Sequence, residues 1–365
     1  MTQIKDVTRY LEIIAPTYLQ EDYDNTGLLT GNPSNEVSGI LITLDCTEDI
    51  VQEAIKLGCN LIVAHHPIIF RGLKNLTGKT YIERTIILAI KNDISIYAIH
   101  TNLDNVSSGV NRKIADKIGL ENLEILSPKP GQLMKITSYV PSEHTNKVIK
   151  ALNDSGAGNI GNYENCSFRV TGTGTFQPND SATPHIGKKG QLEEVIEDRI
   201  ELIFPNHLKN KILNSLKSSH PYEEVAYYLH QLENLDQDIG SGMIGTLPTP
   251  MEPEEFLLHL KNSMELNTIR YTHGYRGEIK RIAICGGSGS FLLKKALQMN
   301  ADAFVSADFK YHEFFDAEDQ LMITDIGHYE SEVCTKDLIY GVLSEKFTKF
   351  ALHLSKVVTN PISYF

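Results

Sequence analysis

The sequence contains no tryptophan, no CxxC pair and no long uninterrupted apolar segment. No apolar run approaches the ~20 residues that a membrane-spanning helix needs. Residues 1–16 carry Asp6, Arg9 and Glu12, so this segment is not expected to be a signal peptide. The cysteines are scattered and odd in number, which indicates reduced thiols and argues against a disulfide framework. They are Cys46, Cys59, Cys166, Cys285 and Cys334. We therefore expect a cytoplasmic protein that does not associate with a membrane.

Positive charge is also scarce. The chain has 34 Lys and Arg against 46 Asp and Glu, which gives a net charge of −12 at pH 7. Because neutralising phosphates requires clustered cations, a broad nucleic-acid-binding surface is not expected. A chain of 365 residues exceeds what one hydrophobic core usually serves, so two or three domains are expected.

The two ends of the chain show the same alternation of strands and helices. Residues 39–65 are predicted to form a buried strand, a helix that stops at Gly58 and a second strand that ends at a His pair. A further buried strand is predicted within 92–104. Residues 280–308 repeat the strand–helix–strand pattern. This alternation predicts two related α/β lobes with mixed sheets, at 1–130 and 236–365.

The middle of the chain, residues 131–235, has a different pattern. The segments 134–152 and 199–216 each read as a strand, a proline and a helix, and a further strand follows each of them. This β-α-β, β-α-β order predicts a ferredoxin-like α+β module inserted between the two lobes.

The segment "IVAHHPIIF" (62–70) places His65 and His66 side by side at the end of a predicted buried strand. Adjacent side chains on an extended segment point to opposite sides, so the two imidazoles serve one ion awkwardly. They could readily serve two ions that lie a few ångströms apart. The alternative is that His65 satisfies a backbone carbonyl in the core.

Carboxylates in two other segments could complete such a centre. Asp104 closes "HTNLD", and His328 and Glu332 lie at i and i+4 in "GHYESE", so they share a helix face. All of these segments follow buried strands, at the sheet edge where ligands bind in α/β proteins. Alternatively, Asp104 is a turn or cap residue, and the His328–Glu332 pair is solvated at a helix N-terminus.

Several further residues are candidates for substrate binding and proton transfer. The segment "CGGSGS" follows a strand and opens a helix, so its amides could seat an anion or simply form a tight turn. His100 and His312 are candidate proton donors, and Asp308 is a candidate substrate contact. Asp24 and Asp45 are adequately explained by turn chemistry. The candidate anion seat consists of Gly286, Gly287, Ser288 and Gly289.

Seven motifs, taken in order, resemble the Nif-three-like family, whose members are often named GTP cyclohydrolase I type two homologues. They are "YDNTGL", "LDCT", "HHP", "HTNLD", "CGGSGS", "DFKYH" and "GHYESE". The middle module looks like the PII/CutA-like insertion of the longer bacterial members. The resemblance implies two lobes that form one cleft around a dinuclear metal centre, with Glu332 as the bridging ligand. Tyr23 stands where many members carry Trp. By motif, the metal ligands are His65, His66, Asp104, His328 and Glu332.

This ligand set favours two divalent ions per chain, as Zn, Mn or Fe. The expected activity is metal-dependent hydrolysis of a nucleotide, by opening of an imidazole ring or by cleavage of a phosphoester. The sequence does not separate these two reactions. The alternative is a non-catalytic metal-binding scaffold that binds partners through the inserted module. The resemblance also implies a toroidal homohexamer, and the acidity of the chain disfavours nucleic acid as its partner.

Overall fold

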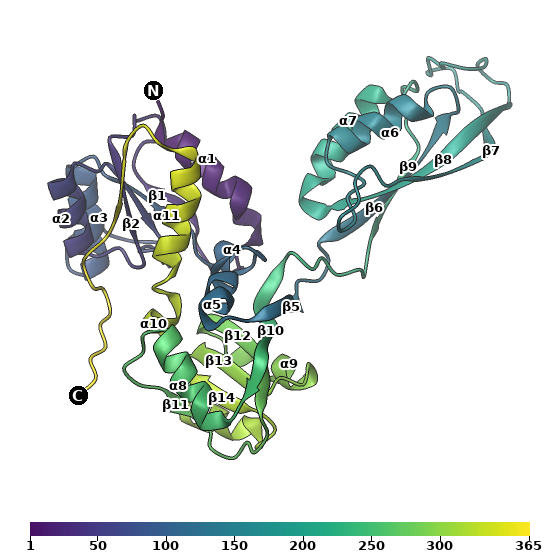
Figure 1. Cartoon of the computed structure of the whole chain (residues 1–365). Coiled ribbons are helices and arrows are strands. Elements are labelled where there is room, and N and C mark those ends of the chain that lie inside the picture. The colour runs from purple at the N-terminus through teal and green to yellow at the C-terminus, as the bar shows by residue number, and fades with distance from the viewer. The chain divides into compact units, whose positions relative to one another are not determined.

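The computed structural model describes all 365 residues and has the mixed α/β character that the sequence predicts (Figure 1). The chain divides into two compact units. Unit 1 comprises residues 1–128 and 237–365, and unit 2 comprises residues 129–236. None of the helices has the length and apolar character needed to cross a membrane.

The first sheet of unit 1 has the order β1-β4-β3-β2-β15. All neighbours are parallel except β1, which runs antiparallel to β4. Every residue of β2, β3 and β4 is buried, which explains their continuous apolar sequences. Gly58, in the left-handed conformation, ends the helix between β2 and β3 as predicted. The elements are α1 (Ile4–Ile14), η1 (Thr17–Leu19), β1 (Gly27–Thr30), β2 (Gly39–Thr43), α2 (Glu48–Leu57), β3 (Leu61–Ala64), α3 (Tyr81–Lys91), β4 (Ser95–Ala98) and β15 (Ala351–Leu354).

The second sheet has the order β11-β14-β13-β12-β10-β5. Strands β12, β13 and β14 are parallel, and β11 is antiparallel to β14. The order β11-β14-β13-β12 therefore repeats the order β1-β4-β3-β2 of the first sheet. The two lobes share one topology, in keeping with their related sequence patterns. The elements are β5 (Glu121–Pro128), β10 (Gly240–Met251), α8 (Pro253–Ser263), β11 (Arg270–Tyr271), β12 (Ile279–Ser288), η3 (Ser290–Leu292), α9 (Leu293–Gln298), β13 (Ala303–Ala307), η4 (Tyr311–Ala317) and β14 (Met322–Asp325).

The sheets do not follow the division of the sequence into an N-terminal and a C-terminal lobe. β5 pairs with β10 in the second sheet, and the C-terminal β15 pairs with β2 in the first. One apolar core continues between the sheets through α5 (Val110–Ile118) and α11 (Thr335–Lys346). The lobes therefore form one interlocked unit, which positions residues from both halves of the chain at a common site.

Unit 2 contains a four-stranded antiparallel sheet with the order β7-β8-β6-β9. Two helices lie on one face of this sheet (Figure 1), over a core that includes Val148, Phe204 and Leu216. The connectivity is β-α-β-β-α-β, the split β-α-β order expected from the sequence. The elements are β6 (Leu133–Pro141), α6 (Thr145–Asp154), β7 (Phe168–Phe176), β8 (Glu193–Pro205), η2 (Asn206–Leu208), α7 (Lys209–Ser219) and β9 (Tyr227–Gln231).

Candidate metal centre

Three chain segments that follow buried strands converge within unit 1. His65 and His66 directly follow β3, and Asp104 lies on the short helix α4 (Thr101–Asp104) that follows β4. His328 and Glu332 lie on α10 (His328–Glu332), which follows β14 of the second sheet. The structure thus brings together all five side chains that the motifs single out as metal ligands.

His65 is completely buried, and its two ring nitrogens have different surroundings. Nδ1 lies 2.8 Å from the carbonyl oxygen of Ile99, so this nitrogen carries the proton and donates it. Nε2 lies 3.6 Å from Oδ1 of Asp104 and 4.0 Å from Oε1 of Glu332. Burial, aided by the charge of neighbouring His66, lowers the pKa of His65 to about 3. His65 therefore satisfies a backbone carbonyl and still offers a lone pair to the site.

Two buried atoms of this cluster lack a hydrogen-bond partner. They are Nε2 of His65 and Oδ1 of Asp104. Burial and the charge of Glu332 raise the pKa of Asp104 well above its usual range. At 3.6 Å the two atoms are too far apart to hydrogen-bond to each other, so both stay unsatisfied at a cost, and a cation between them would satisfy both. The residues therefore fit a metal ion.

Glu332 is buried between two imidazoles. Its Oε2 lies 2.9 Å from Nε2 of His66 and 3.1 Å from Nε2 of His328. Burial opposes ionisation of the carboxyl group, but hydrogen bonds from His328 and His66 hold the pKa of Glu332 well below its usual range. Oε1 faces His65, and Oε2 faces the other two imidazoles. The carboxylate therefore belongs to two groups of candidate metal ligands, one with His65 and Asp104 and one with His66 and His328.

Carboxylates also bind the outer nitrogens of these imidazoles. Nδ1 of His66 lies 2.8 Å from Asp45, and Nδ1 of His328 lies 2.6 Å from Asp308. Burial lowers the pKa of both imidazoles, but their carboxylate partners raise the pKa of His66 to about 10 and that of His328 to about 9. A carboxylate on the outer nitrogen fixes the ring orientation and is typical of metal-binding histidines.

Asp24 and Asp45 therefore do more than shape turns, which is a correction to the sequence interpretation. Asp24 accepts a hydrogen bond from Nδ1 of His100 at 2.8 Å and another from the amide of Thr101. No local sequence signal pairs these aspartates with their histidines, which lie 76 residues from Asp24 and 21 residues from Asp45. Asp308, a candidate substrate contact, accepts a hydrogen bond from Nδ1 of His328.

The two candidate proton donors differ in position. The ring of His100 lies 5.3 Å from that of His65 and 5.2 Å from that of His66, measured between centroids. His312 is exposed on η4, where it packs against Tyr311 and Phe315, and it does not line the site cavity. The structure thus brings His100 to the site and leaves His312 outside it.

Two amides of the glycine-rich segment, which the sequence offers as an anion seat, already have partners within the protein. The amide of Gly286 donates to Oδ1 of Asn111, and the amide of Gly287 donates to Oγ of Ser331, both at 2.9 Å. Gly287 has φ of 60°, and a Cβ there would lie 2.3 Å from Oε1 of Glu332. The glycine therefore makes room for the Glu332 carboxylate. Gly289 is similarly crowded, and only Ser288 joins Gly286 in lining the cavity.

A cavity of about 420 Å³ opens next to the cluster. It is lined by His66, His100 and Glu332, and also by the exposed aromatic rings of Tyr23, Phe70 and Phe291. The rings of Tyr23 and Phe70 lie 6.1 Å apart. The cavity thus combines a candidate metal centre with flat apolar surfaces on which a planar group could stack.

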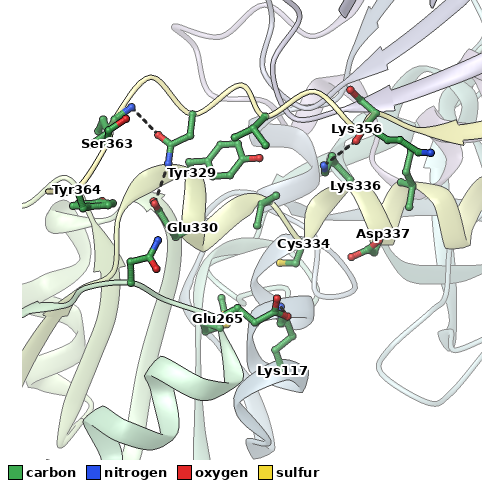
Figure 2. A pocket seen from close by; sticks show the side chains of 18 residues that line it. Lys117, Glu265, Tyr329, Glu330, Cys334, Lys336, Asp337, Lys356, Ser363 and Tyr364 are labelled. Carbon is green, nitrogen blue, oxygen red and sulfur yellow. Dashed lines mark hydrogen bonds and ion pairs between the residues drawn. The ribbon is translucent and has the colours of Figure 1, made fainter. Parts of the chain in front are cut away.

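The C-terminal segment contacts two residues that neighbour the site. Thr359 donates to Oδ2 of Asp45 at 2.6 Å, and Asn360 donates to Oε1 of Glu330 on α10 at 2.9 Å. Figure 2 shows this segment passing over α10 and α11, where it lines a second cavity of about 1010 Å³ that contains Glu330, Cys334 and Tyr364. The segment thereby connects Asp45, the partner of His66, with α10, the helix that carries Glu332.

Replacing Asp45 with asparagine is expected to weaken metal binding by roughly 10-fold to 100-fold, the usual cost of losing an outer carboxylate partner. The amide no longer supplies the negative charge that holds His66 in place. Titration with Zn²⁺ against a competing chelator measures the change. Asp49→Asn, on the exposed first turn of α2, serves as the control, and equal affinities in the two variants would contradict the expectation.

Metal affinity is expected to rise with pH. A cation must displace the protons on His66 and His328, whose pKa values of about 10 and about 9 lie above neutrality. Below pH ~9, at least these two protons should therefore be released per chain, and affinity should increase as the pH rises. Calorimetry in buffers of different ionisation enthalpy counts the released protons. An affinity that does not change between pH 6 and 9 would show that these imidazoles are not ligands.

Fold and site together define a two-lobed α/β protein with a candidate His–carboxylate metal centre. The family model described as Duf34/NIF3 (NGG1p interacting factor 3) matches residues 2–361. The chain belongs to this family, as its motifs predict.

Two relatives, both called GTP cyclohydrolase 1 type 2 homolog, illustrate the similarity. The protein of Halalkalibacterium halodurans is 40% identical over 363 residues, which is 98% of each chain. That of Staphylococcus epidermidis is 36% identical over 366 residues, 99% of this chain and 100% of the relative. Among solved structures, the Bacillus cereus protein related to NIF3 superimposes with a TM-score of 0.85 at 36% identity, over 100% of this chain and 99% of the other.

Proposed function

We propose that the centre holds two divalent metal ions and that the protein is a metal-dependent hydrolase that acts on a nucleotide. The observation that carries the proposal is the pair of buried, unpartnered atoms, Nε2 of His65 and Oδ1 of Asp104, facing Glu332. His65, Asp104 and Glu332 would hold one ion. His66, His328 and the same Glu332 would hold the other.

The donor set consists of imidazoles and carboxylates, without a thiolate, which favours Zn, Mn or Fe. Divalent ions at these positions would act as Lewis acids and would generate a nucleophile from water near neutral pH. The chain's own residues orient the substrate. A purine ring could stack on Tyr23, Phe70 or Phe291, which would bring its imidazole ring or its phosphates toward the cluster.

His100 is proposed to deliver a proton to the leaving nitrogen or oxygen. Asp24 binds its Nδ1, which leaves Nε2 for the cavity. Replacing His100 with asparagine is expected to lower kcat by roughly 10²-fold to 10⁴-fold, the range for general acid–base groups. Metal content per chain should stay at the wild-type value. Loss of metal in the variant would instead make His100 a ligand.

The proposal is tested by measuring metal content and turnover on the same preparations. Elemental analysis of protein purified without added metal should give about two ions per chain, the stoichiometry of a two-metal site. Hydrolysis of GTP and other nucleotides is then followed by product analysis. His312→Ala serves as a control, because the exposed His312 lies outside the cavity. Full metal content without hydrolysis of any nucleotide would support the scaffold function instead.

We also propose, from the family resemblance, that unit 2 is a PII/CutA-like insertion and that the chain forms a toroidal homohexamer in the cytoplasm. The β-α-β-β-α-β connectivity of unit 2 supports the first of these statements. Light scattering coupled to size-exclusion chromatography tests the assembly. A hexamer requires a mass about six times the 40.8 kDa of one chain.

A further inference from the structure

A cavity of about 440 Å³ lies in unit 2 and shares no residue with the metal centre. It opens on the sheet face opposite α6 and α7. Asp198 of β8 bonds to Thr145 of α6, so the adjacent Glu197 points to the other face. Residues 177–186 and 222–226 supply the rest of the cavity wall. This cavity therefore uses the open face of the sheet and is independent of the helix-covered core.

Glu197 places a carboxylate in this cavity, on the central strand β8. Its side chain is buried, with 8% of the residue exposed, and no lysine or arginine lines the cavity. The other carboxylates of the wall are Glu223 and Glu224, and Glu223 already accepts a hydrogen bond from the amide of Thr183. Burying a carboxylate without a cation is costly, so a cation bound in this cavity would be stabilised by Glu197.

Two neighbours lie against the Glu197 carboxylate. Burial and the hydroxyl's position beside Glu197, to which it can donate, raise the pKa of Tyr222, so the phenol stays protonated. Gly174 on β7 lacks a side chain at the point of closest approach, where a Cβ would lie 2.0 Å from Oε2 of Glu197. Any larger residue at Gly174 would cover the carboxylate.

Four aromatic rings also line the cavity. Tyr139 and Tyr228 form a pair with ring centroids 6.2 Å apart, and Phe176 lies 5.8 Å from Tyr222. Aromatic faces attract cations that carry an apolar shell, and a carboxylate at the end of an aromatic cavity strengthens this preference.

We propose that the cavity of unit 2 binds a small organic cation, with its ammonium group against Glu197 and its apolar body against the aromatic rings. The ligand chemistry is that of a primary or methylated amine. This site does not rest on the proposed hydrolase function, because none of its residues belongs to the metal centre.

Isothermal titration calorimetry on the full-length protein tests the proposal with matched probes. Choline is compared with 3,3-dimethylbutan-1-ol, which has the same shape without the charge, and 2-phenylethylammonium is compared with 2-phenylethanol. At least one cation should bind roughly tenfold more tightly than its neutral counterpart. If neither cation does so, the proposal is wrong.

Substitutions then localise the binding. Glu197→Gln should remove the preference for the cation, whereas Glu224→Gln, which removes a charge from an exposed residue of the wall, should retain it. Circular dichroism verifies that both variants are folded. A preference that persists in the folded Glu197→Gln variant would overturn the assignment. So would a response only to Zn²⁺ that is lost in His185→Ala, because His185 lies within metal-binding distance of Glu143 and His144.

Discussion

Replacing Glu332 with glutamine is expected to abolish binding at both metal positions and, with it, nucleotide hydrolysis. Glutamine keeps the size of the side chain but loses the negative charge that both candidate ligand groups share. Affinity for Zn²⁺ should fall by more than about 100-fold. That value is the upper end of the loss when a residue that only hydrogen-bonds to a metal ligand is replaced, and Glu332 is itself a proposed ligand. Elemental analysis and chelator competition measure the loss, and calorimetric unfolding verifies that the variant is folded.

Glu330→Gln provides a matched control on the same helix. Glu330 lies two residues from Glu332, but its carboxylate contacts Asn360 of the C-terminal segment and not the imidazoles. Its replacement should leave about two ions per chain, as a two-metal site requires. If folded Glu332→Gln retains as much metal as Glu330→Gln, the metal centre does not lie where we propose.

Gly287→Ala is expected to disrupt both the fold and the metal centre. The added Cβ would lie 2.3 Å from Oε1 of Glu332 and 3.2 Å from Cε1 of His328, on a backbone with φ of 60°. Left-handed strain and overpacking together should lower the free energy of unfolding by roughly 3 kcal/mol. The displaced carboxylate should also reduce metal binding. Thermal unfolding with and without Zn²⁺ measures both effects.

Gly119→Ala separates backbone strain from the steric clash. Gly119 ends α5 with φ of 80°, and no atom lies within 4 Å of a Cβ placed there. This variant should lose only about 1 kcal/mol, the cost of the left-handed conformation alone, and should bind metal normally. Equal destabilisation of the two variants would show that the contact with Glu332 is unimportant.

Local patterns were sufficient to predict most elements and the candidate ligands. The helices α1 and α2 follow from apolar periodicity and their terminal signals, and β2, β3 and β13 follow from continuous apolar runs. His65, His66 and Asp104 could be placed at strand ends, because parallel strands present their carboxyl ends to one edge of a sheet. His328 and Glu332 could be placed on one helix face by their spacing.

Contacts between distant segments could not be predicted in this way. Asp45 orients His66 across the turn after β2, and Asp308 reaches His328 from another strand end. In the sequence, Asp45 looks like an ordinary turn residue and Asp308 like a substrate contact. The glycines at 286 and 287 look like an anion-binding turn, because nothing local reveals that Asn111 and Ser331 occupy their amides. The exposure of His312 likewise depends on how η4 packs.

The exchange of β5 and β15 between the sheets has a consequence for biosynthesis. During translation, β2 emerges near the start of the chain, but its neighbour β15 is synthesised some three hundred residues later. The nascent first sheet must therefore keep an exposed apolar strand edge open, the situation in which aggregation competes with folding. The strands of unit 2 are contiguous in sequence and can pair as soon as they leave the ribosome. Unit 1, whose candidate ligands come from both ends of the chain, can therefore complete its first sheet only after almost the whole chain has been synthesised.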